Sequence, residues 1–193
     1  MQAAAELFAV KGFRATTVRD IAEEAGILSG SLYAHIETKE KLYLEIVHRA
    51  AVDFSNAVEP IVVNASQDPA AKLREMVQAH LTVIGDSRAW AQVYLDDNAA
   101  LSGEARAQAR GLCRQYERLW DQVLDDGLRL GVFRVSDESL ARLFILSALN
   151  GVIRWYNPAG RLSPDAIGSA FAAMILRLLE AVDTASWGPH NVI

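Results

Sequence analysis

Residues 16–42 decide the fold of this chain, and they read TTVRDIAEEAGILSGSLYAHIETKEKL. The spacing of apolar residues in the first part of this stretch predicts a short helix, whose apolar stripe comprises Val18, Ile21, Ala22 and Ala25. Thr16 or Thr17 can cap the start of this helix, and Gly26 can end it in a left-handed conformation. The stretch therefore begins with a short capped helix and a glycine turn.

The second half of the stretch predicts another short helix and the start of a third. Leu32, Tyr33 and Ile36 share one helical face, and Thr38 can cap the helix that follows. Two short helices joined by a glycine-containing turn form a helix-turn-helix, whose second helix enters the major groove of DNA. The alternative interpretation is a small helical subdomain with ordinary caps.

Polar residues around the second helix suit contact with DNA. Ser29, Gly30 and Ser31 open this helix with small side chains, which allow the backbone to approach DNA closely. Phosphate contacts position a protein without specifying sequence. The longer side chains that can make them belong to Tyr33, His35 and Lys39.

A series of short motifs stands at fixed offsets in this region. It comprises Gly12-Phe13, Thr16-Thr17, Ile21-Ala22, Ala25-Gly26, Gly30-Ser31-Leu32-Tyr33, His35-Ile36 and Thr38-Lys39-Glu40-Lys41-Leu42. This series resembles the TetR-type transcriptional regulators. Two positions depart from the family pattern, because Leu28 stands where Ser or Thr usually caps the recognition helix and Ile36 replaces a Phe. The resemblance implies a dimeric repressor that binds a palindromic operator in double-stranded DNA.

The charge distribution predicts only modest non-specific affinity for DNA. The net charge is −5, and residues 1–49 hold six Lys or Arg against seven Asp or Glu. Arginines and helix N-termini nevertheless make the DNA-facing side locally basic. The residues that we expect at the DNA surface are Arg14, Thr16, Thr17, Arg19, Ser29, Gly30, Ser31, Leu32, Tyr33, His35, Thr38 and Lys39.

The whole chain reads as all-α, with about nine helices. Apolar periodicity and caps predict helices at 3–10, 17–25, 39–59 and 70–84, and further helices that start after Ser87, Ser102, Ser136 and Ser163. Pro60 is expected to bend or end the fourth helix. We divide the chain into a helix-turn-helix head at 1–45 and an effector-binding and dimerisation body at 46–193, with no Gly/Ser-rich linker between them.

Bulk properties favour a cytoplasmic protein. No stretch of about 18 apolar residues occurs, so nothing is expected to span a membrane. The first residues carry no basic region typical of a signal peptide. The single cysteine, Cys113, rules out an internal disulfide and is expected to be a buried thiol rather than a sensor.

The last two predicted helices have more apolar surface than packing against the core of a single chain would bury. Residues 143–149 are apolar nearly all round, and the ninth helix has two apolar stripes. An exposed apolar face of this size predicts a two-fold homodimer; the alternative is a monomer whose core uses both faces. The expected interface residues are Leu143, Phe144, Ile167, Phe171, Met174 and Leu178.

The body has an excess of aromatic residues, which predicts an apolar effector pocket with a few polar groups. Asn150, Arg154, His80 and Gln92 could supply the polar groups of this pocket. The alternative is that these aromatics simply fill the core. The expected ligand-binding residues are Trp90, Tyr94, Tyr116, Trp120, Phe144, Asn150, Arg154 and Trp155.

A narrower resemblance concerns the effector. Residues 154–164, RWYNPAGRLSP, are similar to a segment of TetR-type regulators of fatty-acid, aromatic and steroid-ring degradation, which respond to acyl-CoA thioesters. Residues 27–33, ILSGSLY, resemble the steroid-ring group most. Arginines at four-residue steps can meet CoA phosphates, although a solvated mixed-charge face also explains them; they are Arg106, Arg110, Arg114 and Arg118.

Other function classes find less support. The histidines are scattered, and the sequence contains no metalloprotease, nucleophile-elbow or phosphate-loop motif. We therefore predict neither an enzyme nor a metal site nor a cofactor. A non-CoA hydrophobic effector and a DNA-binding protein without any ligand stay open as alternatives. A roomy cavity lined by aromatic residues would favour an effector-binding protein, whereas a fully packed body would favour a DNA-binding protein without a ligand.

Overall fold

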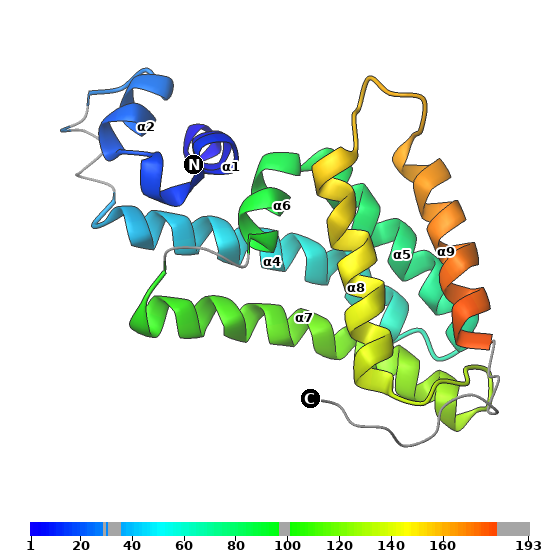
Figure 1. Ribbon diagram of the computed structural model, residues 1–193. Helices are drawn as coiled ribbons and strands as arrows, with labels where there is room; N and C mark the ends of the chain where they lie inside the picture. The colour runs from blue at the N-terminus through cyan, green and yellow to red at the C-terminus, as the bar shows by residue number, and fades with distance from the viewer. Residues whose placement is uncertain (29, 31–35, 97–100, 181–193) are drawn as a thin grey trace, which may run out of the picture.

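The computed structural model of this chain describes residues 1–28, 30, 36–96 and 101–180. Within them all regular elements are helices (Figure 1). They are α1 (Gln2–Ala15), α2 (Val18–Glu24), α4 (Lys39–Val62), α5 (Pro69–Asp86), α6 (Arg88–Leu95), α7 (Gly103–Arg129), α8 (Glu138–Trp155) and α9 (Pro164–Glu180). The fold class is all-α, as predicted. Among the expected DNA contacts, Ser29, Ser31, Leu32, Tyr33 and His35 lie outside the described residues.

Side-chain caps start several of these helices where the sequence predicts them. Thr17 accepts a hydrogen bond from the backbone N of Asp20 at 3.1 Å, and the Asp20 carboxylate accepts one from the backbone N of Thr17 at 2.8 Å. This reciprocal pair is a capping box, and it assigns the cap of α2 to Thr17. Hydrogen bonding with Thr17 also lowers the pKa of Asp20. Thr38 and Ser163 accept the corresponding bonds at the starts of α4 and α9.

Other predicted boundaries differ from the structure. Asp137, rather than Ser136, caps α8, because its carboxylate accepts a hydrogen bond from the N of Leu140 at 2.9 Å. Ser87 and Ser102 make no side-chain cap hydrogen bond. Gly12 interrupts α1 with a φ of 81°, but the helix resumes to Ala15. Pro60 lies in the last turn of α4, where its missing N–H removes only one hydrogen bond, so the helix continues to Val62.

The core is one continuous cluster that extends from α1 to α9. The long helix α4 runs from the head into the body, where it packs against α5, α6 and α7, while α8 packs on α7 and α9 on α5 (Figure 1). Its buried residues include Tyr43, Ile46 and Phe54. Burial of each such side chain contributes about 1.5–3 kcal/mol. The head therefore shares its core with the body, and the proposed boundary near residue 45 stays a prediction.

Lys39 joins the first helix of the head to α4. Its ammonium group donates hydrogen bonds to the backbone O of Phe13 at 2.8 Å and of Thr16 at 2.7 Å. The same nitrogen lies 4.4 Å from the centre of the Phe13 ring. These contacts satisfy carbonyls at the end of α1 that have no helical partner. Lys39 thus has a structural role in addition to the phosphate contact that the sequence suggests.

Replacement of Lys39 by Ala is expected to lower the free energy of unfolding by about 2 kcal/mol, because two carbonyls lose charge-assisted hydrogen bonds. Urea unfolding followed by circular dichroism measures this change. Lys41→Ala is the matched control: Lys41 pairs with Glu37 on the exposed surface, and its loss should cost less than about 0.5 kcal/mol. Equal destabilisation by the two substitutions would contradict the assigned role of Lys39.

Candidate ligand pocket and nucleic-acid interface

The exposed residues of the head outline a candidate nucleic-acid interface. Arg14, Thr17, Arg19, Gly30 and Thr38 are all exposed. The two threonine hydroxyls are already engaged as helix caps. Among these exposed residues, Arg14 and Arg19 are therefore the ones whose long basic side chains can reach a phosphate.

Thr16 differs from the expectation of a DNA contact. Its side chain is fully buried, and its hydroxyl donates a hydrogen bond to the backbone O of Gly12 at 2.8 Å, with Leu7 O at 3.3 Å. The hydroxyl closes the turn after α1 and cannot reach a phosphate from there. The two adjacent threonines therefore have different structural roles, because the Thr16 hydroxyl stabilises the turn after α1 and the Thr17 hydroxyl caps α2.

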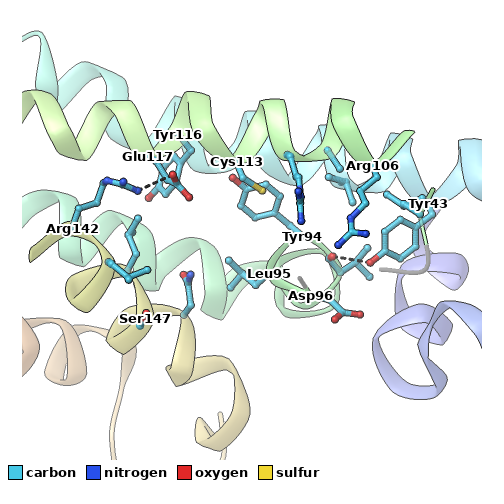
Figure 2. Close-up of a pocket in the computed structure, with 18 residues that line it drawn as sticks. Tyr43, Tyr94, Leu95, Asp96, Arg106, Cys113, Tyr116, Glu117, Arg142 and Ser147 are labelled. Carbon is cyan, nitrogen blue, oxygen red and sulfur yellow. Dashed lines mark hydrogen bonds and ion pairs between the residues drawn. The ribbon is translucent and has the colours of Figure 1, made fainter. Parts of the chain in front are cut away.

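A cavity of about 290 Å³ lies in the body between α4, α6, α7 and α8 (Figure 2). Its wall includes three tyrosines, Tyr43 from α4, Tyr94 from α6 and Tyr116 from α7. Burial raises the pKa of each tyrosine, so the hydroxyls stay protonated. The remaining apolar wall consists of Val47, Val93, Leu95, Leu101, Ala109, Cys113, Leu143 and Leu146.

Three of the predicted ligand residues line this cavity, namely Tyr94, Tyr116 and Asn150. Trp120 is instead fully buried in the core, with its ring against Tyr116 and His80. Trp90 lies against the head, where its indole N–H donates to Gln2. The aromatic composition of the body could not distinguish a core residue from a wall residue, because both are apolar and helical.

The other three predicted ligand residues are on α8 but outside the cavity. Phe144, Arg154 and Trp155 are exposed and do not line the cavity. Successive residues of a helix point about 100° apart. Phe144 and Trp155 therefore point away from the side of α8 that holds Leu146 and Asn150 toward the cavity. Arg154 is on the same side as Asn150 but one turn further along the helix, and it does not line the cavity.

One wall of the cavity comes from α7, where the sequence suggested Arg106 and Arg110 as phosphate ligands but did not indicate Cys113 or Glu117. Arg106, Arg110, Cys113 and Glu117 follow one another at three- and four-residue steps along α7 and all line it (Figure 2). Both arginines are exposed at its mouth, whereas Arg114 and Arg118 are exposed outside it. The periodicity was visible in the sequence, but its partner helices were not. Asp96, Arg142 and Ser147 also line the cavity.

An ion cluster fixes α8 against α7 at one side of the cavity. The Arg142 guanidinium contacts Glu117 through Nη1 at 2.7 Å and Asp121 through Nε at 2.7 Å. The arginine side chain is mostly buried, which strengthens the pairing. Because Arg142 is held by two carboxylates, Arg106 and Arg110 carry the cationic character of the cavity mouth.

A buried polar group adjoins the inner wall. The Nδ1 atom of His80 lies 2.8 Å from the Tyr116 hydroxyl oxygen. Burial lowers the pKa of His80 to about 3, and hydrogen bonding with Asn150 opposes this change in part. His80 is therefore neutral near pH 7. Gln92, another predicted polar candidate, donates instead to the backbone O of Ala9 at 2.9 Å and so joins α6 to α1.

The outer surfaces of α8 and α9 form an exposed apolar face. Leu143, Phe144 and Met174 are 58%, 53% and 55% exposed, and Leu140, Trp155 and Leu178 are exposed beside them. Phe171 is half-buried against Trp155, with ring centres 6.3 Å apart. Ile167, an expected interface residue, is instead buried in the core at 3% exposure. We call this exposed set the α8–α9 face.

Two kinds of site are absent from the described ranges. None of their helices is long and apolar enough to cross a membrane. Nowhere in them do three or more His, Cys, Asp or Glu residues gather in a way that would hold a metal ion.

Comparison with protein families gives two matches that together span most of the chain. Residues 1–46 match the family of bacterial regulatory proteins called tetR. Residues 66–179 match the C-terminal domain described as tetracyclin repressor-like.

Individual proteins are similar over nearly the full length. The HTH-type transcriptional repressor KstR2 of Rhodococcus jostii is 35% identical over 97% of this chain and 89% of its own. The solved structure of the ketosteroid transcriptional regulator KstR2 of Mycobacterium tuberculosis has a TM-score of 0.83 at 32% identity, covering 92% of this chain and 91% of that one. AibR, solved in complex with isovaleryl coenzyme A and operator DNA, shares the fold, with a TM-score of 0.82 at 23% identity over 90% and 94% of the two chains.

Proposed function

Because this chain belongs to the TetR family of bacterial regulatory proteins, a family of DNA-binding regulators rather than enzymes, we propose that it acts as a homodimer whose operator is released by an acyl-CoA thioester. The chain is a ligand-responsive transcriptional repressor of the TetR type. Its two heads bind the half-sites of a palindromic operator. It works in the cytoplasm, where the operator is.

The α8–α9 face supports the homodimer. Its exposed leucines, aromatic residues and Met174 are large apolar side chains left in solvent on two neighbouring helices, as at protein–protein contacts. A two-fold axis across this face pairs α8 and α9 with their copies in a four-helix bundle. The same axis places two heads on one operator.

The cavity is the main structural support for a thioester effector. Its interior is apolar and aromatic, and Arg106 and Arg110 stand one turn apart at its mouth. A volume of about 290 Å³ suits an acyl group of moderate size. The guanidinium groups can bind the phosphates of a CoA moiety that remains outside the cavity. AibR, which shares the fold, was solved with an acyl-CoA thioester, isovaleryl coenzyme A.

Helix α6 offers a route from the cavity to the head. Val93 and Tyr94 of α6 line the cavity, while Gln92 and Trp90 donate hydrogen bonds to Ala9 and Gln2 of α1. A ligand that displaces α6 therefore displaces α1. Recognition helices must lie about 34–36 Å apart to meet two half-sites, so a small displacement of each head weakens operator binding.

A pair of double variants tests the thioester proposal. Arg106→Ala with Arg110→Ala removes the two cations at the cavity mouth and should raise the half-release concentration of a thioester about tenfold or more, since each charged hydrogen bond contributes about 1.5–3 kcal/mol. Arg114→Ala with Arg118→Ala is the matched control, with the same spacing and charge loss outside the cavity. Its half-release concentration should stay at the wild-type value.

The measurement uses an operator selected from random DNA fragments by the purified protein. Fluorescence anisotropy follows its release by isovaleryl-CoA, octanoyl-CoA and cyclohexanecarboxyl-CoA. Calorimetry of the same thioesters gives their affinity directly. Absence of binding to all of them, together with release by a hydrophobic compound without CoA, would exclude the thioester and leave the repressor in place.

A further inference from the structure

A leucine in the turn that follows α2 is exposed to solvent. The Leu28 side chain is 83% exposed, although leucine is among the residues most often buried in proteins. Among the described residues, Leu28 belongs neither to the core cluster nor to the apolar residues packed against it. Single exposed apolar residues are common on protein surfaces. Leu28 differs from them in two respects, which are its attachment to a fixed turn and its position beside the predicted recognition helix.

Hydrogen bonds at the end of α2 fix the backbone of this turn. Gly26 has a φ of 67°, and its N donates to Glu23 O at 3.1 Å. The N of Ile27 donates to Ala22 O at 3.0 Å. These two bonds form a Schellman motif, in which a left-handed glycine satisfies the last carbonyls of a helix. Leu28 follows the motif directly, so its position relative to α2 is defined.

Leu28 also lies next to the part of the head that approaches DNA. The second helix of a helix-turn-helix enters the major groove, and its N-terminal residues contact base edges. The sequence predicts that this helix opens with the small residues Ser29, Gly30 and Ser31, and Gly30 is exposed. Small side chains allow the backbone to approach the groove closely. The longer Leu28 side chain, which directly precedes them, is then within reach of the base edges.

The chemistry of leucine limits what it can recognise on DNA. A leucine side chain neither donates nor accepts a hydrogen bond, so it cannot bind a phosphate or a polar group of a base edge. In the major groove, thymine alone among the four bases presents an apolar group, which is its C5-methyl. Contact between this methyl group and a leucine removes apolar surface of both from water.

We propose that Leu28 recognises the methyl group of a thymine in the operator and so contributes to the choice of DNA sequence. The proposed function leaves the operator sequence open. The inference adds to it one thymine in each half-site, beside the bases that the second helix contacts. It also divides the described contacts into two kinds. Arg14 and Arg19 bind phosphates and position the head without specifying sequence, whereas Leu28 specifies a base.

Replacement of single thymines by uracil tests the proposal, because this exchange removes only the methyl group from the base. The DNA is an operator selected from random fragments by the purified protein, and the thymines of one half-site are replaced one at a time. At one position the exchange should weaken binding of the wild-type protein about fourfold, in line with the burial of one methyl group. Fluorescence anisotropy measures both affinities, and their ratio is the methyl preference.

Variants then assign the preference to Leu28. Leu28→Ser removes the apolar side chain from an exposed position, so the core is unchanged and the methyl preference should fall to about one. Leu28→Met keeps an apolar side chain of similar volume, and the preference should persist. Val10→Ser is the matched control: Val10 is 84% exposed on α1, outside the turn, so the loss of this equally exposed side chain should leave the preference unchanged.

The outcomes separate this inference from the proposed function. Equal binding of thymine and uracil at every position, a half-site without thymine, or a methyl preference that Leu28→Ser retains overturns the role of Leu28. The measurement uses no effector, so each of these results leaves the thioester repressor intact. A protein that selects no operator at all contradicts the repressor function, and the inference with it.

Discussion

Met174→Glu is expected to convert the homodimer into monomers that no longer hold an operator. Met174 is 55% exposed near the middle of α9, within the α8–α9 face. A two-fold interface places each Glu close to the partner's apolar face, where two carboxylates lose water without gaining a partner. Because two linked heads bind far better than one, operator affinity should fall by about a hundredfold or more.

Light scattering measures the mass of the variant, and fluorescence anisotropy measures its operator affinity. Val63→Glu is the control, because Val63 is an exposed apolar residue at the end of α4, outside the α8–α9 face. It should remain dimeric and bind operator normally. A folded Met174→Glu protein that is still dimeric would place the interface on another surface.

Gly127→Ala is expected to be the most destabilising single methyl addition on α7. A Cβ at Gly127 would stand 2.0 Å from Cδ2 of the Phe133 ring, which is itself buried. The ring has to move in a packed core, at a cost of about 1–3 kcal/mol or more. The turn beyond Phe133 joins α9, because Arg134 N donates to Leu179 O at 2.8 Å. Loss of this packing should therefore weaken dimerisation as well.

Gly111→Ala provides the comparison on the same helix. No atom lies within 4 Å of a Cβ built there, and Ala favours a helix over Gly by about 0.5–1 kcal/mol. This substitution should raise the unfolding midpoint, whereas Gly127→Ala should lower it. Thermal unfolding of both proteins decides the point, and a change of the same sign in the two would refute the packing argument.

Local signals made the secondary structure readable from the sequence. A cap such as Thr17 acts on residues within one helical turn, so its partner Asp20 stands three positions away in the chain. The cap of α8 was misplaced by one residue because Ser136 and Asp137 are both suitable, and only the backbone geometry decides between them. The all-α class followed from many such signals together.

The cavity depends on contacts that no local signal specifies. His80 and Tyr116 are 36 residues apart in sequence. Whether an aromatic residue of α7 faces the cavity, as Tyr116 does, or the core, as Trp120 does, depends on how neighbouring helices pack. Lys39 illustrates the same limit in the head. The sequence suggests a phosphate contact for Lys39, but it does not show that the ammonium group also reaches carbonyls more than twenty residues earlier.

The attachment of α6 to α1 bears on the engineering of hybrid regulators. A head transplanted at residue 45 onto the body of another regulator would lose two hydrogen bonds to α6. These are the bond from Trp90 to the Gln2 side chain and the bond from Gln92 to the Ala9 backbone O. The transplanted head would keep its DNA specificity, but effector binding in the cavity would no longer change the position of the head. A functional hybrid therefore has to carry the matching residues of α6 with the head, even though some forty positions of foreign sequence separate the two segments.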